Sequence, residues 1–192
     1  MQIPRTMRLL IFGLALFQPL PDCYHTDYLL LHFRPNATNS TIMIEIAIPG
    51  LDALRLEYLV TDCDGKLLPG SADALRLLAD KLAIHVVTAD TFGDAAESLG
   101  DLPCKLAVLP SGNQSAAKMT YVQNLGASRC VCIGNGRNDR LMLATAALGI
   151  AVVQKEGAAV ETVMAAKVVA PDIVAALELL LNPKRLIATL RD

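Results

Sequence analysis

The stretch that decides the fold is Leu59-Val-Thr-Asp62-Cys-Asp64-Gly65, where a short aliphatic run ends on two carboxylates and a glycine. Aliphatic runs of this length are typical of strands that are buried on both faces of a parallel sheet. In open parallel sheets, ligands bind beyond the carboxyl ends of the strands. The stretch therefore predicts an α/β fold with a functional site directly after this strand.

The rest of the chain repeats this pattern, because short aliphatic runs alternate with helix-like stretches. The runs are Leu59–Thr61, Ile84–Val87, Leu106–Leu109, Val131–Ile133, Ile150–Val153 and Val168–Val169. The amphipathic stretches between them include Ala72–Leu82, Ala116–Leu125 and Ile173–Leu181. This βαβ repetition predicts a doubly wound (Rossmann-like) parallel sheet. The preceding stretch 43–56, broken by Pro49-Gly50, predicts an N-terminal β-hairpin at one edge of that sheet.

Composition supports a folded α/β protein and excludes other classes. Hydrophobic residues make up 53% of the 192 residues, which argues against disorder, while aromatic residues make up only 4%. The formal net charge is −2, so there is no electrostatic reason to expect nucleic acid or an anionic membrane surface as a partner. A core of Ala, Leu, Val and Ile is consistent with buried parallel strands.

A change in composition marks a domain boundary near residue 42. Five of the eight aromatic residues lie in the first 42 positions, and a cluster of Pro, Asn, Ser and Thr over 35–41 precedes the alternating pattern that starts at Met43. We therefore expect residues 1–42 to be an N-terminal extension outside the fold, and residues 43–192 to form one domain.

The extension leaves two interpretations open. Arg5 and Arg8 precede the apolar stretch Leu9–Phe17, which has the length of a signal peptide, so residues 1–23 leave export as an alternative. No clean small-residue cleavage site follows, which favours Met43 as the working start of a cytoplasmic domain.

The five cysteines have irregular spacing and predict no disulfide framework; Cys130 and Cys132 are interpreted as buried core thiols.

Polar residues follow several of the predicted strands, at the edge where parallel strands end. They include Asp62 and Asp64 after the first strand, Thr88 after the second, and Asp139 in the loop Gly134-Asn-Gly-Arg-Asn-Asp139. Carboxylate oxygens suit Mg²⁺, and a metal-bound aspartate can also attack phosphorus. The residues therefore predict phosphoryl chemistry at this edge.

The chain resembles the haloacid dehalogenase (HAD) superfamily of phosphohydrolases. Asp62-Cys-Asp64-Gly65 matches all but the last position of the family motif Asp-x-Asp-Gly-Thr, Thr88 matches the second motif, and Lys118 on the helix 115–125 matches the third. The loop 134–139 matches the fourth motif. The stretches 44–50 and 180–187 are also similar to the small soluble P-type ATPase-like group of this superfamily.

The resemblance implies roles for eight residues. Asp62 would be the nucleophile that forms an aspartyl phosphate, and Asp64 the general acid and base. Thr88 and Lys118 would bind the phosphate of a phosphorylated substrate. Mg²⁺ would be the cofactor. Its ligands would be Asp62, Asp64 through its backbone carbonyl, and Asp139. The supporting residues would be Gly65, Asn135 and Asn138.

Three departures from the family pattern keep other functions open. Lys66 stands where the family has Thr, and the segment after it is too short for the usual flap. Asn135 replaces the commoner Asp. Lys66 and the missing flap favour a catalytically weak or inactive binding module as the alternative. A further alternative is an ATPase-type phosphorylation domain, although Asp64 favours hydrolysis because ATPase-type domains carry Thr there.

The spacing between the motifs leaves no room for a cap domain. An uncapped site is open to water, so the resemblance implies either a large substrate that covers the site or a homo-oligomer whose neighbour supplies a lid.

Two residues have a purely structural interpretation. Lys118, taken without the other motifs, would be interpreted as a solvated helix residue. His85 lies inside an apolar run and is interpreted as a core or edge histidine.

Overall fold

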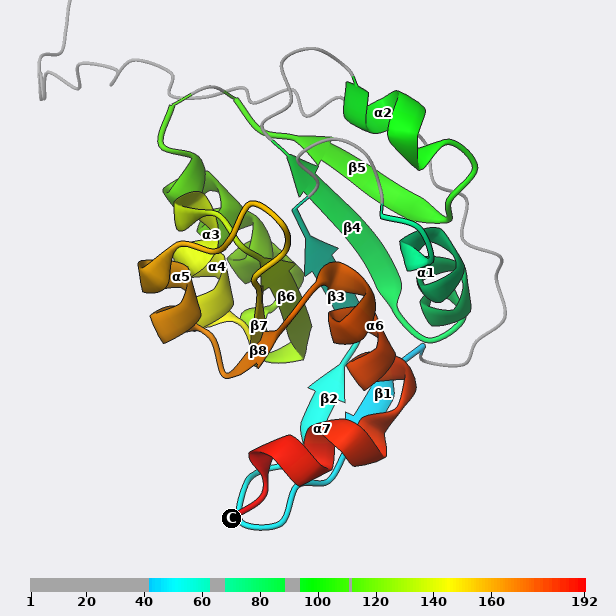
Figure 1. The fold of residues 1–192 in the computed structure, drawn as a ribbon, viewed down its shortest axis with the longest axis vertical. Helices are drawn as coiled ribbons and strands as arrows, with labels where there is room; N and C mark the ends of the chain where they lie inside the picture. Colours follow the sequence, from blue (N-terminus) through cyan, green and yellow to red (C-terminus); the bar gives the residue numbers. More distant parts are fainter. Residues whose placement is uncertain (1–41, 63–67, 89–93, 111) are drawn as a thin grey trace, which may run out of the picture.

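The six-stranded parallel sheet predicted from the sequence is present in the computed structural model, which describes residues 42–62, 68–88, 94–110 and 112–192 (Figure 1). The strand order is β5-β4-β3-β6-β7-β8, and every neighbouring pair is parallel. The strands are β3 (Tyr58–Thr61), β4 (Ala83–Thr88), β5 (Cys104–Val108), β6 (Cys130–Gly134), β7 (Leu148–Val152) and β8 (Val168–Ala170). The chain builds outward from β3 to β5 and then restarts at β6, so the order reverses between β3 and β6.

Helices cover both faces of the sheet, which makes the fold doubly wound. One face carries α1 (Ser71–Ala79), α2 (Asp94–Leu99) and α6 (Ile173–Leu181). The other face carries α3 (Gln114–Leu125), α4 (Arg140–Thr145) and α5 (Val160–Ala165). Short 3₁₀ turns lie at η1 (Ala127–Arg129) and η2 (Arg137–Asp139). In the described ranges, no element forms a separate cap over the sheet.

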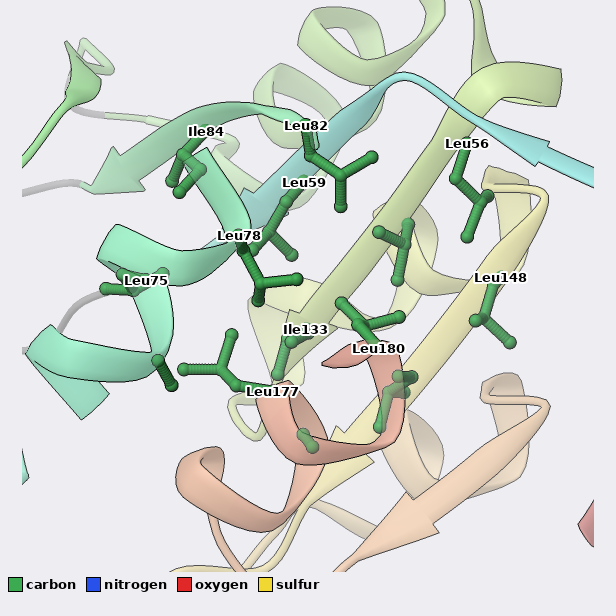
Figure 2. Packing of buried hydrophobic residues seen from close by; sticks show 14 of the residues in the cluster. Leu56, Leu59, Leu75, Leu78, Leu82, Ile84, Ile133, Leu148, Leu177 and Leu180 are labelled. Atoms are coloured by element: carbon green, nitrogen blue, oxygen red, sulfur yellow. The ribbon is translucent and has the colours of Figure 1, made fainter. Parts of the chain in front are cut away.

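Side-chain alternation along the strands creates two cores. In β6, Val131 and Ile133 face the helices α1 and α6, whereas Cys130 and Cys132 face α3 and α4. Figure 2 shows the first core, in which leucines of α1 and α6 pack over Leu59 and Ile133. Both cysteines are fully buried, which confirms their interpretation as core thiols.

The hairpin is present, but its predicted place at the edge of the sheet is wrong. Strands β1 (Ile44–Ile46) and β2 (Leu54–Leu56) form a separate antiparallel sheet, and the edges of the large sheet are β5 and β8. The reason is the single residue, Glu57, that separates β2 from β3. Because β3 is a central strand with β4 and β6 on its two sides, the hairpin can only extend from its amino end.

The hairpin and the carboxy-terminal helix close the far end of the first core. Ile44, Ile46 and Leu56 are buried there together with Leu186 of α7 (Pro183–Leu190). Residues 1–41 lie outside the described ranges, so the predicted extension and the boundary near residue 42 remain predictions. None of the helices in the described ranges is long and apolar enough to cross a bilayer.

Candidate functional site

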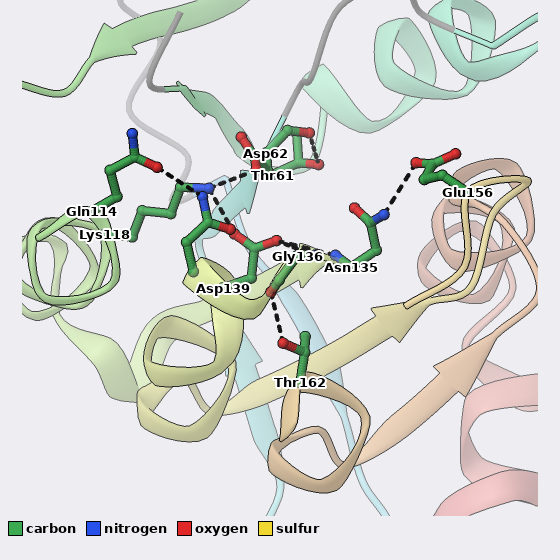
Figure 3. Close-up of polar contacts among 10 residues, drawn as sticks. Thr61, Asp62, Gln114, Lys118, Asn135, Gly136, Asp139, Glu156 and Thr162 are labelled. Atoms are coloured by element: carbon green, nitrogen blue, oxygen red, sulfur yellow. Dashed lines mark hydrogen bonds and ion pairs between the residues drawn. The ribbon is translucent and has the colours of Figure 1, made fainter. Parts of the chain in front are cut away.

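Three segments that are far apart in the sequence meet where the strand order reverses. Asp62 follows β3, Asp139 lies in η2 after β6, and Lys118 comes from α3. Nζ of Lys118 lies 2.5 Å from Oδ2 of Asp62 and 2.7 Å from Oδ1 of Asp139 (Figure 3). The crevice at a strand-order reversal is the usual ligand site of such sheets. The geometry therefore brings three of the residues predicted from the sequence into direct contact.

The ion pairs are almost completely removed from water. The side chains of Lys118 and Asp139 are 0% exposed and that of Asp62 is 4% exposed. Burial by itself lowers the pKa of Lys118, but the charges of Asp62 and Asp139 and the hydrogen bonds to them raise it by more, so the pKa lies above its usual value. Lys118 is therefore a fixed cation at neutral pH. It is not the solvated helix residue that would be expected if Lys118 were considered without the other motifs.

The glycines of the fourth motif make room for Asp139. A Cβ on Gly134 would lie 2.5 Å from Cγ of Asp139, which is closer than real side chains approach. Oδ2 of Asp139 accepts hydrogen bonds from the backbone N–H groups of Asn135 at 3.1 Å and Gly136 at 2.9 Å. One carboxylate oxygen of Asp139 therefore stabilises the loop 134–139, and the other binds Lys118.

Asn138 links the same loop to the start of α3. Its Nδ2 donates a hydrogen bond to Oε1 of Gln114 at 3.0 Å. Helix α3 begins at this point because the side chain of Asn113 accepts a hydrogen bond from the N–H of Ala116 and caps the helix. The predicted supporting residue Asn138 therefore fixes the helix that carries Lys118.

Asn135 points in a different direction, toward the turn that follows β7. Its Nδ2 donates to Oε1 of Glu156 at 3.1 Å and to the carbonyl oxygen of Gly157 at 3.2 Å. Thr162, at the start of α5, donates from Oγ1 to the carbonyl oxygen of Gly136 at 2.6 Å. The segment after β7 therefore supports the fourth motif from the side opposite Lys118.

The remaining predicted site residues fall into two groups. Thr88 is the last residue of β4 and is 2% exposed. It lies at the carboxyl end of β4, beside the carboxyl end of β3 that Asp62 follows. Asp64 and Gly65 lie outside the described residues, as does Lys66 with its shortened flap. Their roles remain predictions.

Comparison with known proteins gives a sequence relative and a set of fold neighbours. No protein-family model matches the chain. The uncharacterized protein MJ0073 from Methanocaldococcus jannaschii is 42% identical over 85 residues, which cover 42% of this chain and 91% of that protein. The chain belongs to the family of MJ0073. The name of this relative states no activity.

The fold neighbours are phosphatases of low sequence identity. The cobalt-bound deoxy-D-mannose-octulosonate 8-phosphate phosphatase of Haemophilus influenzae has a TM-score of 0.56 at 15% identity, over 68% of this chain and 90% of that one. The Moraxella catarrhalis 3-deoxy-D-manno-octulosonate 8-phosphate phosphatase, in complex with magnesium, phosphate and KDO, has a TM-score of 0.56 at 16% identity, over 70% and 92%.

A Legionella pneumophila protein named as an HAD superfamily (subfamily III A) hydrolase has a TM-score of 0.57 at 16% identity, over 70% of this chain and 87% of that one. The fold is that of the HAD superfamily. The resemblance inferred from four sequence motifs is thus confirmed at the level of the fold, and the similarity to the P-type ATPase-like group remains a prediction.

Within this HAD fold, the donor atoms suit a hard divalent cation. In the described part of the chain, no cluster of three His, Cys, Asp or Glu side chains has the spacing of a metal site. The site still offers carboxylate oxygens from Asp62 and Asp139 and the amide oxygen of Asn135, which are ligand types that Mg²⁺ and Ca²⁺ accept. Oxygen-only donors fit the cation that the sequence predicts.

Several residues of this site have no signal in the sequence. Gln114, Glu156 and Thr162 lie outside the four motifs, and only the fold brings them to the loop 134–139. Ser115 is also unexpected, because its hydroxyl is buried and finds no hydrogen-bond partner among the residues that the structure describes. It shares the buried face of α3 with Lys118, one turn nearer the start of the helix.

Proposed function

We propose that this chain is a Mg²⁺-dependent phosphohydrolase that works through an aspartyl phosphate on Asp62. The observation that carries the proposal is the buried contact of Lys118 with both Asp62 and Asp139, at the strand-order reversal of an HAD fold. A fixed cation beside a carboxylate nucleophile is suited to stabilise the charge of a phosphoryl group as it is transferred.

In the proposed reaction, a carboxylate oxygen of Asp62 attacks the phosphorus of a phosphate monoester. The new bond joins Asp62 to phosphorus, the ester P–O bond breaks, and Asp64 gives its proton to the departing alkoxide. Water then attacks the phosphorus while Asp64 takes up its proton. The bond from phosphorus to Asp62 breaks, which releases inorganic phosphate and restores both carboxyl groups to their starting state.

The other residues bind and orient. Lys118 and Thr88 would bind the phosphoryl oxygens, with Lys118 held in place by Asp139. Asp62, Asp64 through its backbone carbonyl, and Asp139 would hold Mg²⁺, which supplies charge stabilisation and orientation of the phosphate when bound. Asp139 already uses one oxygen for Lys118 and the other for two backbone N–H groups, so its contacts support the orienting role more strongly than the metal role.

The substrate is proposed only as a class, a phosphate ester. The Moraxella catarrhalis neighbour with bound magnesium and phosphate supports both the metal and the phosphoryl group. The absence of nucleic acid and membrane partners, a cytoplasmic location and a homo-oligomer that covers the open site remain expectations from the sequence.

The test is hydrolysis of an aryl phosphate by the full chain with and without Mg²⁺. We expect turnover that disappears on chelation and in Asp62→Asn. The matched control is Asp172→Asn, because Asp172 only caps α6 through the N–H of Ala175 and Asn caps equally well. An Asp62→Asn protein that is folded and retains metal-dependent turnover would refute the proposal.

A binding module without turnover is the second candidate, and the amide at Asn135 favours it. A neutral amide in place of a carboxylate lowers the negative charge available for a cation. This alternative predicts that inorganic phosphate binds and protects the fold against thermal unfolding while no phosphate ester is hydrolysed across a substrate panel. Metal-dependent turnover of any ester above the buffer rate excludes it.

A further inference from the structure

The turn after β7 contacts the fourth motif through both side-chain and backbone groups. Glu156 and the carbonyl oxygen of Gly157 accept the two hydrogen bonds from Nδ2 of Asn135. The backbone N–H of Ala159 donates to the carbonyl oxygen of Asn135 at 2.9 Å. Asn135 is therefore held at three points by one short segment.

The segment that holds Asn135 is itself anchored. The N–H of Gln154 donates to the carbonyl oxygen of Pro171 at 2.9 Å, which ties the turn to the segment after β8. Gln154 and Gly157 have positive φ values of 54° and 88°, so the turn has a specific left-handed geometry. A defined turn of this kind places the Glu156 carboxylate reproducibly beside Asn135.

These contacts decide which way the amide of Asn135 faces. Nδ2 is only a donor, while a carboxylate oxygen and a backbone carbonyl are only acceptors. Turning the amide over would place its oxygen against two acceptors, so the observed orientation is strongly favoured. The carbonyl oxygen of the amide, Oδ1, consequently lies on the side away from Glu156, and Figure 3 shows the Asn135 side chain between Glu156 and the Asp62 end of β3.

We infer that Glu156 is a positioning residue that presents Oδ1 of Asn135, and not its nitrogen, to a divalent cation bound beside Asp62. The inference deepens the proposed function and rests on it. Without the acceptors on the turn, an Asn amide is free to rotate and to offer a donor where a cation needs an acceptor. The Glu156 carboxylate also places one negative charge behind an amide that carries none.

Outer-shell groups that orient metal ligands change metal affinity by about 10-fold to 100-fold when they are removed. We expect Glu156→Ala to weaken Mg²⁺ binding by about 10-fold, the lower end of this range, because it removes the side-chain acceptor and leaves the carbonyl oxygen of Gly157 to hold Nδ2. Glu156→Gln keeps an oxygen acceptor for Nδ2 and should stay within about 3-fold of the wild type. This difference separates orientation of the amide from the mere presence of a charge.

The experiment is titration of the metal-free, full-length chain with MgCl₂ by calorimetry, with no substrate present. The charge-matched control is Glu161→Gln, since Glu161 lies on α5 and pairs with Arg137 at 3.1 Å. The side-chain amide signals of Asn135 in a ¹⁵N NMR spectrum, assigned by their loss in Asn135→Asp, report the orientation directly. Their hydrogen exchange should accelerate in Glu156→Ala and stay unchanged in Glu161→Gln.

A third variant pair strengthens the test. Asn135→Asp places two carboxylates against each other, so it should lower the thermal midpoint, and adding Glu156→Gln should restore that midpoint. Glu156→Ala with unchanged Mg²⁺ affinity, or with unchanged exchange of the Asn135 amide, would overturn the inference while leaving the proposed function intact. A wild-type chain that binds no Mg²⁺ would overturn both.

Discussion

Replacing Lys118 with Met tests whether the buried ion pairs hold the site together. Met has nearly the length of Lys but no charge, so Lys118→Met leaves Asp62 and Asp139 at 4% and 0% side-chain exposure without their shared cation. Removing one partner of a buried ion pair costs about 3–5 kcal/mol, because an uncompensated charge remains in a poorly solvated place. Against a total stability of about 5–15 kcal/mol, this is a large fraction.

The assay is urea unfolding of the wild type and the variant, followed by circular dichroism at neutral pH without metal. Arg55→Met is the control, because Arg55 pairs with Glu45 at 3.1 Å on the surface, where both side chains are at least half exposed. We expect the control to lose less than about 1 kcal/mol. The unfolding free energy does not depend on catalysis, so it tests the geometry separately from the proposed reaction.

A double-mutant cycle then assigns the effect to the pair. In Lys118→Met combined with Asp139→Asn, the amide oxygen of Asn can still accept from the backbone N–H groups that Asp139 holds, and one buried charge is gone. The double variant should therefore be more stable than the sum of the two single losses predicts, by about 1–3 kcal/mol. A Lys118→Met protein within about 0.5 kcal/mol of the wild type would refute the argument.

Three further predictions concern stability. Burial, and to a smaller extent the charge of Lys105, lowers the pKa of His85 from 6.5 to about 4. The unfolded chain therefore takes up the proton first as the pH falls. The contribution of His85 to the free energy of unfolding is complete above pH 6.5 and falls by about 3 kcal/mol as the pH drops to 4. Nδ1 of His85 lies 2.7 Å from the Tyr121 hydroxyl, and His85→Gln keeps a group able to bond that hydroxyl. Urea unfolding at a series of pH values should show that this variant loses the pH dependence of the unfolding free energy. An unchanged pH dependence would contradict the assignment to His85. Gly134→Ala should cost about 1–3 kcal/mol, because its Cβ would overlap Asp139, and a thermal midpoint equal to that of the wild type would count against the steric role of Gly134. Ser115→Ala should leave stability unchanged or raise it by about 1 kcal/mol, because the hydroxyl has no partner in the described part of the chain. Ser71→Ala should lower stability, because Oγ of Ser71 donates to the carbonyl oxygen of Leu68 at 2.6 Å. Equal losses in the two variants would show that the Ser115 hydroxyl is bonded in solution.

Much of the fold follows from local patterns that the sequence displays directly. The six aliphatic runs all became strands of one sheet, with ends that differ by at most two residues from the expected ones. Helix 173–181 has the predicted ends, because Asp172 caps its first turn and Asn182 ends it. The place of the hairpin was not predictable in this way, since it depends on which strands occupy the two sides of β3.

The site was predictable to the extent that its residues follow strands or belong to ordered motifs. Asp62, Lys118 and Asp139 meet as the motif order indicates. Glu156 and Thr162 were not predictable, because their contacts depend on how the segment after β7 folds back onto the loop after β6. Such contacts leave no spacing signal in a single sequence.

Helix α3 shows how a functional site changes the buried face of a helix. Its buried residues are Ser115, Lys118 and Val122, so two of the three positions facing the protein interior are polar. The helix itself was predicted, over 116–125, but its interior positions carry a cation and a hydroxyl where a purely structural helix carries apolar side chains. Local rules are expected to fail at functional sites, since stability is given up there for chemistry. The buried lysine on this helix face, paired with two carboxylates, is therefore itself an argument that the site lies where β3 and β6 end.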